Sequence, residues 1–410
     1  MGKLIYAAII IGVLSGIFVT LYSVFTEFLT VIFYGGIENI PNLPWWYLYL
    51  VPTLSILTVN FLITKNESVK EYGVSEIAKA VEENKLFFTF KDLILKIFAS
   101  SISIASGFAI GNEGPSAAIG AMIAQKTHEF LKIPKNFLKL FLSMGASGGI
   151  AAIFVSPITG IMFAIENIAY EFIKNYIGYI ILSGVIAFSI AYHFLEPLIF
   201  NYSMGKFIEY RYIFASLFFI PVITFFIYFY LGLKDKVLNF LNKTIKTSHK
   251  NWIFAIIGGG SIGTILLISP YAAFSGHEIV KTLINGNFHM PLYFIFIIIV
   301  LRIIATSVSI YANAVGGVFI ALMSIGALVG YGYGELLMGL GIKTEPFYFA
   351  AIGAAAFMGV NMKLPLTAIV LALEVTYDYN VIIPTGITTI ITSYLVSINF
   401  KIKKLKFQRS

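Results

Sequence analysis

The chain has 410 residues, of which 58% are hydrophobic and only 12% are charged, and its formal net charge is +8. Soluble domains are typically about 45–50% apolar and about 25% charged, so this composition excludes a soluble globular protein. The sequence has no cysteine, which excludes disulfides and thiolate chemistry. The lysines and arginines gather in short segments between apolar runs, as the positive-inside rule describes, so the basic charge indicates membrane topology and not a nucleic-acid partner.

Long apolar runs predict membrane helices, because a helix needs about 20 mostly apolar residues to cross a bilayer. In chain order they cover residues 4–34, 45–63, 177–195, 207–231, 252–273 and 291–310. The runs are apolar on every face, whereas the strands of a membrane β-barrel alternate in polarity. The first run is longer than the roughly 7–15 apolar residues of a signal peptide, so we expect a retained helix. These features predict an all-α, multi-pass protein of the cell membrane.

Two basic segments indicate the orientation of the chain. Residues 234–250 include five lysines, and residues 401–410 include four lysines and Arg409. Cytoplasmic loops carry the excess of lysine and arginine in membrane proteins. We therefore expect both segments, and with them the C-terminus, in the cytoplasm.

The sequence contains an internal repeat. Residues 145–168 (GASGGIAAIFVSPITGIMFAIENI) match 353–376 (GAAAFMGVNMKLPLTAIVLALEVT) at an offset of 208, and 119–123 (IGAMI) match 325–329 (IGALV) at an offset of 206. Small residues align easily in membrane helices, but the shared Pro, Thr, Ile, Ala and Glu spacing indicates a duplication. We predict one transmembrane domain over residues 1–410, with halves at 1–205 and 206–410. Transporters built from repeats bind substrate near the midplane, where helices are interrupted.

The two halves also share a predicted helix start. At the offset of 206, GNEGP at 111–115 falls on GVFIA at 317–321. A helix N-terminus presents unpaired amides and about half a positive charge, which together form a site for anions. Glycine lets the backbone approach a ligand closely, and Pro115 suits a first helical turn. We therefore predict an anion site between two helix starts.

Glu113 is the most informative residue of this segment. An ionised side chain at membrane depth costs at least about 2.5–3.5 kcal/mol and usually marks an ion pathway. The charged carboxylate can occupy the helix end in place of an anion, and the protonated form can swing away, which couples protons to anions. The alternative is that Glu113 only caps the helix that it opens. Glu166 and Glu374 share one repeat position, nine residues after a proline, and we expect them to hold helix ends by hydrogen bonds.

These motifs resemble the CLC family of chloride channels and proton–chloride antiporters. GNEGP resembles the GREGP signature with Glu113 at the gating glutamate, and residues 145–166, 316–330 and 364–376 are similar to CLC segments in family order. The resemblance covers nearly the whole chain. It implies a CLC-type fold of two inverted-topology halves with many tilted, partly broken helices, and a homodimer with one anion pathway per subunit. It also implies transport of small inorganic anions, chloride first, with proton antiport favoured over a passive channel or a fluoride transporter.

The resemblance assigns residues to the anion site. Gly111, Asn112 and Gly114 surround Glu113 in the signature motif, and Val318 and Phe319 occupy the positions whose backbone amides bind the central anion. The resemblance also implies that Phe319 lines the pathway. Asn112 replaces the usual arginine and removes one positive charge, so we expect a lower anion affinity.

Three further positions depart from the family pattern. The GSGIP motif reads EYGVS at 71–75, so the anion-coordinating serine falls on Tyr72, whose phenol can donate a hydrogen bond or narrow the pathway, while a shifted alignment brings Ser75 there. The inner-gate tyrosine falls on Leu405, with Phe407 as the nearest aromatic residue. The inner proton-relay glutamate is Asn167, which cannot titrate. This change weakens the case for tight proton coupling, and leaves Glu113 with water to carry protons.

Other classes of protein fit the sequence less well. An intramembrane enzyme needs a nucleophile with its base or a metal cluster, and we expect no enzymatic activity, metal or cofactor. The five histidines are scattered and do not form the helical zinc motif: His128, His193, His249, His277 and His289. A carrier of organic anions also uses broken helices, but a pathway lined by Phe319 and backbone amides suits a small bare ion better. Because the chain stops at Ser410, we expect no cytoplasmic CBS domains.

Overall fold

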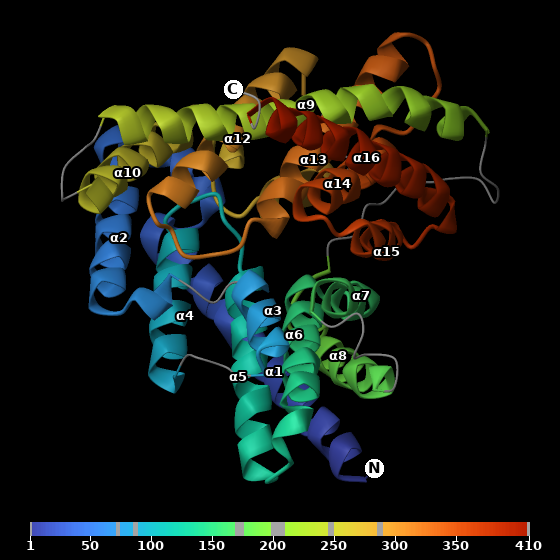
Figure 1. Ribbon diagram of the computed structural model, residues 1–410. Coiled ribbons are helices and arrows are strands. Elements are labelled where there is room, and N and C mark those ends of the chain that lie inside the picture. Colours follow the sequence, from blue (N-terminus) through green and yellow to red (C-terminus); the bar gives the residue numbers. More distant parts are fainter. Residues whose placement is uncertain are drawn as a thin grey trace.

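The computed structural model describes residues 2–70, 74–84, 89–168, 176–197, 210–244, 250–284 and 290–407. Within these ranges the chain is helical: α1 (Gly2–Tyr34), α2 (Trp45–Lys65), α3 (Val74–Glu82), α4 (Phe90–Ala105), α5 (Glu113–Phe130), α6 (Leu138–Phe154), α7 (Pro157–Ile168), α8 (Ile177–Ala191), α9 (Tyr210–Thr244), α10 (Lys250–Ile268), α11 (His277–Ile284), α12 (Leu292–Tyr311), α13 (Phe319–Gly339), α14 (Pro346–Met362), α15 (Pro365–Thr376) and α16 (Ile382–Phe407). In Figure 1, α5–α8 lie below α13–α16, and the two groups meet where α7 contacts α15. The all-α prediction is confirmed.

The membrane helices are present where the apolar runs predicted them. In the described part of the chain, eight helices are long and apolar enough to cross a membrane: α1, α2, α6, α9, α10, α12, α13 and α16. Helix α8 is an exception, because it has 15 residues, fewer than the roughly 20 that a perpendicular crossing needs. Large apolar side chains such as Phe18, Leu21 and Phe28 of α1 are at least half exposed. A protein with such a surface is a multi-pass protein of the membrane.

The two basic segments are partly helical. Helix α9 continues to Thr244, so Lys234, Lys236 and Lys243 lie on its last turns, and α16 continues through the lysine-rich stretch to Phe407. Lysine is a good helix former, and the apolar part of each helix already supplies the nucleus that propagation needs. Both helices therefore continue beyond their apolar runs into the basic segments. The predicted boundary between the halves, at residues 205 and 206, lies outside the described residues.

Two close helix crossings occur at matching positions of the repeat. Helix α5 crosses α6 where Gly120 meets Gly145, and a Cβ atom on Gly120 would lie 1.9 Å from the Gly145 carbonyl oxygen. Helix α13 crosses α14 where a Cβ atom on Gly326 would lie 2.1 Å from the Gly353 carbonyl oxygen. Small residues let membrane helices approach backbone to backbone. These crossings fix the directions in which α5 and α13 point their N-termini.

Glu166 and Glu374 tie the two halves together by reciprocal capping. The Glu166 carboxylate accepts hydrogen bonds from the backbone N–H groups of Leu366 (3.0 Å) and Thr367 (2.8 Å), at the start of α15. The Glu374 carboxylate accepts from the N–H groups of Ile158 (2.8 Å) and Thr159 (2.6 Å), at the start of α7. The threonine hydroxyls add a bond on each side. The prediction that both glutamates hold helix ends is confirmed, and each holds a helix of the opposite half.

A pair of buried cations follows the same symmetry. Lys96 of α4 is 3% exposed and donates to the carbonyl oxygen of Val69 at 3.3 Å. Arg302 of α12 is fully buried and donates to the carbonyl oxygen of Ser275 at 3.1 Å, and to two further carbonyls of the segment before α11. Lys96 and Arg302 are 206 residues apart in the sequence, and so are Val69 and Ser275, whose carbonyl oxygens accept from them. Each cation holds by hydrogen bonds the segment that precedes a short helix, α3 or α11, because a buried charge must find polar partners.

Candidate functional site

The starts of α5 and α13 are held against each other by two glycines. The Gly111 N–H donates to the Gly317 carbonyl at 2.7 Å, and the Gly317 N–H donates back to the Gly111 carbonyl at 2.7 Å. This antiparallel bridge is the only strand-like pairing in the described residues. Asn112 and Val318 follow the glycines as the N-cap residues of α5 and α13. The predicted helix starts are therefore confirmed, and they lie face to face.

The Glu113 carboxylate lies at the N-terminus of the opposite helix. Glu113 is the first residue of α5 and only 1% exposed, and its Oε1 atom accepts a hydrogen bond of 2.8 Å from the backbone N–H of Ile320 in the first turn of α13. This side-chain hydrogen bond goes to α13, so the carboxylate does not act only as a cap of the helix that it opens. The carboxylate occupies the place where the unpaired amides and the dipole of α13 favour an anion.

The second carboxylate oxygen of Glu113 has no hydrogen-bond partner among the described residues. A buried polar atom without a partner costs about 1–3 kcal/mol. This position of the carboxylate at the start of α13, which we call its seat, gives one oxygen a hydrogen-bond partner and leaves the other without one. Such a balance favours a side chain that can exchange this position for another.

Two glycines leave room for the carboxylate. A Cβ atom on Gly111 would lie 2.2 Å from Glu113 Oε1, and a Cβ atom on Gly317 would lie 2.2 Å from Oε2. Any side chain at either position would therefore overlap the carboxylate. The absence of a side chain at both positions lets the backbone approach the charged group closely.

An aromatic cluster covers this site. Phe319, the first residue of α13, is 1% exposed, and its ring centroid lies 4.4 Å from that of Phe154 and 6.3 Å from that of Phe163. Phe154 is the last residue of α6, and Phe163 belongs to α7. Phe319, Phe163 and Glu113 are each at most 1% exposed, and electrostatic attraction is stronger where groups are buried away from water. Neither Phe154 nor Phe163 carried a sequence signal that separates it from an ordinary core residue.

The structure describes some of the other residues assigned to the anion pathway only in part. Gly114 lies in the first turn of α5, next to Glu113. Asn112 makes no capping hydrogen bond with its side chain, while its carbonyl accepts from the Ser116 N–H at 3.0 Å. Asn167 and Leu405 lie in α7 and α16, but their side chains, like all of Tyr72, are outside the described part of the structure. The anion contacts assigned to these residues stay predictions.

The buried cations Lys96 and Arg302 are features that the sequence analysis missed. Each lies in a mostly apolar helix that precedes one of the two helix starts. A charged residue in an apolar run is unusual, and the recurrence of a cation at the offset of 206 was visible in the printed sequence. Applying the repeat to lone charges as well as to motifs would have found the pair.

Comparison with known proteins places the chain in a family. The family described as "Voltage gated chloride channel" matches residues 54–397. The H(+)/Cl(-) exchange transporter ClcA of Salmonella paratyphi A is 26% identical over 411 residues, which cover 94% of this chain and 83% of that protein.

Two solved structures share the fold. A slow cyanobacterial Cl-/H+ antiporter matches with a TM-score of 0.81 and 20% identity, over 96% of this chain and 93% of that one. A CLC-type fluoride/proton antiporter matches with a TM-score of 0.77 and 18% identity, over 96% and 95%. These likenesses confirm the CLC-type fold. Because the family match extends over most of the described helices, the chain belongs to the CLC family, the family of voltage gated chloride channels.

Proposed function

We propose that this protein transports small inorganic anions, chloride foremost, across the cell membrane in exchange for protons, and that Glu113 gates the pathway. One observation carries the proposal: the Glu113 carboxylate occupies the N-terminus of α13, 2.8 Å from the Ile320 amide. A helix N-terminus attracts an anion of any kind. The carboxylate and the transported anion therefore compete for one place.

Protonation decides this competition. A neutral carboxyl group has lost the charge that α13 attracts, so the side chain leaves its seat and an inorganic anion enters. The amides of Val318, Phe319 and Ile320 are then free to hold that anion. When the proton leaves Glu113, the carboxylate returns and displaces the anion. One residue thus links the movement of a proton to the movement of an anion.

Proton exchange is favoured over passive conduction by two considerations. The 26% identical relative carries the name of an exchange transporter, and a titratable gate at the anion site is the part that exchange requires. Asn167 lacks a proton-relay carboxyl, so protons reach Glu113 from the inner side through water. The family resemblance further supports a homodimer with one pathway per subunit. The lysines at the ends of α9 and α16 support a cytoplasmic C-terminus.

Anion efflux from proteoliposomes tests the proposal. Chloride and fluoride electrodes record the anions while a dye records the internal pH. For the wild type we expect chloride efflux that drives protons uphill. Efflux without proton movement would identify a channel, and efflux of fluoride alone would identify a fluoride transporter.

The variant Glu113→Gln tests the role of the gate. Glutamine imitates the protonated side chain, so we expect anion flux at or above the wild-type rate with no coupled proton movement. Glu345→Gln is the matched control, because Glu345 is an exposed glutamate at a helix start with no capping bond from its side chain. Proton-coupled transport that persists in Glu113→Gln would contradict the gating role.

A further inference from the structure

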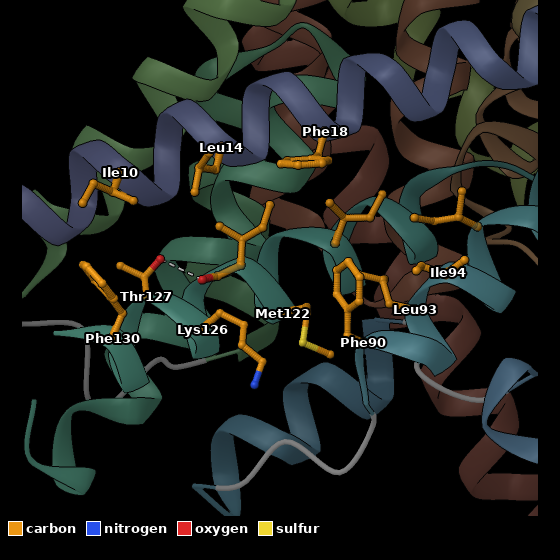
Figure 2. Close-up of a pocket in the computed structure, with 13 residues that line it drawn as sticks. Ile10, Leu14, Phe18, Phe90, Leu93, Ile94, Met122, Lys126, Thr127 and Phe130 are labelled. Atoms are coloured by element: carbon orange, nitrogen blue, oxygen red, sulfur yellow. Dashed lines mark hydrogen bonds between the residues drawn. The ribbon is translucent and has the colours of Figure 1, made fainter. Parts of the chain in front are cut away.

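A groove runs along the side of the first half, between α1, α4 and α5 (Figure 2). Its volume is about 510 Å³, and three residues of α1, four of α4 and six of α5 line it. In the close-up, Ile10, Leu14 and Phe18 of α1 form one wall and face the side chains of α4 and α5. None of the residues assigned to the anion site lines the groove. It is therefore a separate feature of the molecule.

The lining is apolar apart from two residues, Lys126 and Thr127. The Thr127 hydroxyl donates to the Ile123 carbonyl of its own helix at 2.8 Å, so its donor is already used. The Lys126 Nζ atom lies 2.7 Å from the Glu129 carboxylate, with 57% and 49% of the two side chains exposed. The groove therefore combines an apolar lining with one accessible ammonium group.

The position of the groove determines what can fill it. Helix α1 is long and apolar enough to cross the bilayer, and the groove residues Phe18 and Ile94 are 50% and 40% exposed, so the groove opens toward lipid. The acyl chains of the surrounding lipids are the apolar groups available at this surface to fill the groove.

Lys126 lies near the membrane surface. Helix α5 ends at Phe130, and the exposed Lys132 follows two residues later. Charged residues cluster where a helix leaves the hydrocarbon region, and long lysine side chains reach toward that level. Lipid phosphates lie at the same level. The ammonium group is thus placed to meet a headgroup whose chain lies in the groove.

We propose that the groove between α1, α4 and α5 binds one acyl chain of an anionic phospholipid, with the headgroup phosphate held by Lys126. Bulk lipid covers any apolar membrane surface without preference for a headgroup. The recessed shape and the single ammonium distinguish this site from such a surface. Glu129 competes with the phosphate for Lys126, so the charge of Glu129 sets how strongly the lipid is held.

Lipid retention by the purified full-length protein tests the proposal. The protein is equilibrated in detergent with equal amounts of phosphatidylglycerol and phosphatidylcholine, and native mass spectrometry counts the lipids that remain bound. We expect the wild type to retain phosphatidylglycerol. A lysine near an anionic lipid surface contributes about a fivefold preference, so Lys126→Gln should lower the ratio of retained phosphatidylglycerol to phosphatidylcholine by about that factor. Glu129→Gln should raise it.

Two matched controls separate the site from the general surface. Lys79→Gln removes an exposed lysine that is paired with a carboxylate four residues later in the chain, as Lys126 is paired with one three residues later, but Lys79 does not line the groove. Ile94→Trp fills the groove, whereas Ile17→Trp changes an equally exposed residue of α1 outside it. We expect only Ile94→Trp to abolish retention of both lipids.

Each outcome decides the proposal. Loss of the headgroup preference in Lys126→Gln, with loss of all retention in Ile94→Trp, supports it. Equal retention of the two lipids by the wild type overturns it, as does a Lys126→Gln variant that behaves like Lys79→Gln. If Ile94→Trp still retains lipid, the acyl chain does not lie in this groove and the proposal is overturned. A changed oligomeric state in that variant overturns it as well, because it shows that a second copy of the chain occupies the groove. Lys126→Gln keeps the proposal testable if Ile94→Trp does not fold.

Discussion

The substitution Gly317→Ala tests whether the carboxylate of Glu113 must sit at the start of α13. The new Cβ atom would lie 2.2 Å from Glu113 Oε2, and contacts under 3.0 Å essentially never occur. The backbone of Gly317 is fixed by its two hydrogen bonds to Gly111. The carboxylate is the part that can move, so alanine expels it from its seat.

The size of the expected effect on anion release follows from the hydrogen bond that is lost. Expulsion breaks the 2.8 Å hydrogen bond between Ile320 N–H and Glu113 Oε1. A hydrogen bond to a charged group contributes about 1.5–3 kcal/mol, which corresponds to roughly a 10- to 150-fold change in how often the carboxylate occupies the seat. An inorganic anion that competes for the seat gains by the same factor.

The assay is anion efflux and internal pH in proteoliposomes. We expect Gly317→Ala to release chloride at least about tenfold faster than the wild type, with less proton movement per anion, because the gate no longer closes. Gly232→Ala is the matched control, since nothing lies within 4 Å of a Cβ atom at that position of α9.

A second variant separates expulsion of the gate from blockage of the pathway. Glu113→Ala removes the carboxylate, so adding Gly317→Ala to it should change nothing if the methyl group acts only on the carboxylate. A double variant slower than Glu113→Ala would show that the methyl group obstructs the anion. If Gly317→Ala by itself matches Gly232→Ala in rate and coupling, the carboxylate does not occupy this seat during transport and the reasoning is wrong.

Three further predictions concern the framework around the site. Glu374→Gln replaces a charged acceptor of the α7 amides, so we expect a loss of about 2 kcal/mol of stability, read as a lower Tm in detergent; an unchanged Tm would exclude the capping role. Gly326→Ala places a Cβ atom 2.1 Å from a backbone oxygen of α14, whereas Gly332→Ala meets only a side-chain atom at 3.4 Å, so only the former should lose its monodisperse peak in size-exclusion chromatography. Lys281 holds the pKa of the Glu196 carboxyl below its ordinary value through a 2.6 Å hydrogen bond. The pair therefore stabilises the fold at pH values above the ordinary glutamate pKa, and this stabilisation is lost as the pH falls through the lowered pKa. Glu196→Gln should lower Tm slightly at neutral pH and not at acidic pH, and a difference that persists in acid would contradict the pairing.

The local features of this protein were predictable from the sequence. Apolar runs specify membrane helices because each run satisfies its own backbone hydrogen bonds in lipid, and glycine and proline specify helix starts through backbone geometry. The positions of Glu113 and Phe319 at two such starts follow from these signals and the repeat. The apolar runs did not mark the ends of α9 and α16, because these helices continue through lysines that lie beyond the runs.

The partners of the charged groups required the tertiary structure. No local pattern states that Glu113 bonds the amide of Ile320, 207 residues away, or that Glu166 and Glu374 each cap a helix of the other half. These contacts exist because close crossings at glycines orient the helices of the two halves toward each other. The sequence by itself determined which helices form and where a charge lies among apolar residues. Only the packing of the two halves decided which helix end each charge meets, since that depends on directions that residues far apart in the chain set together.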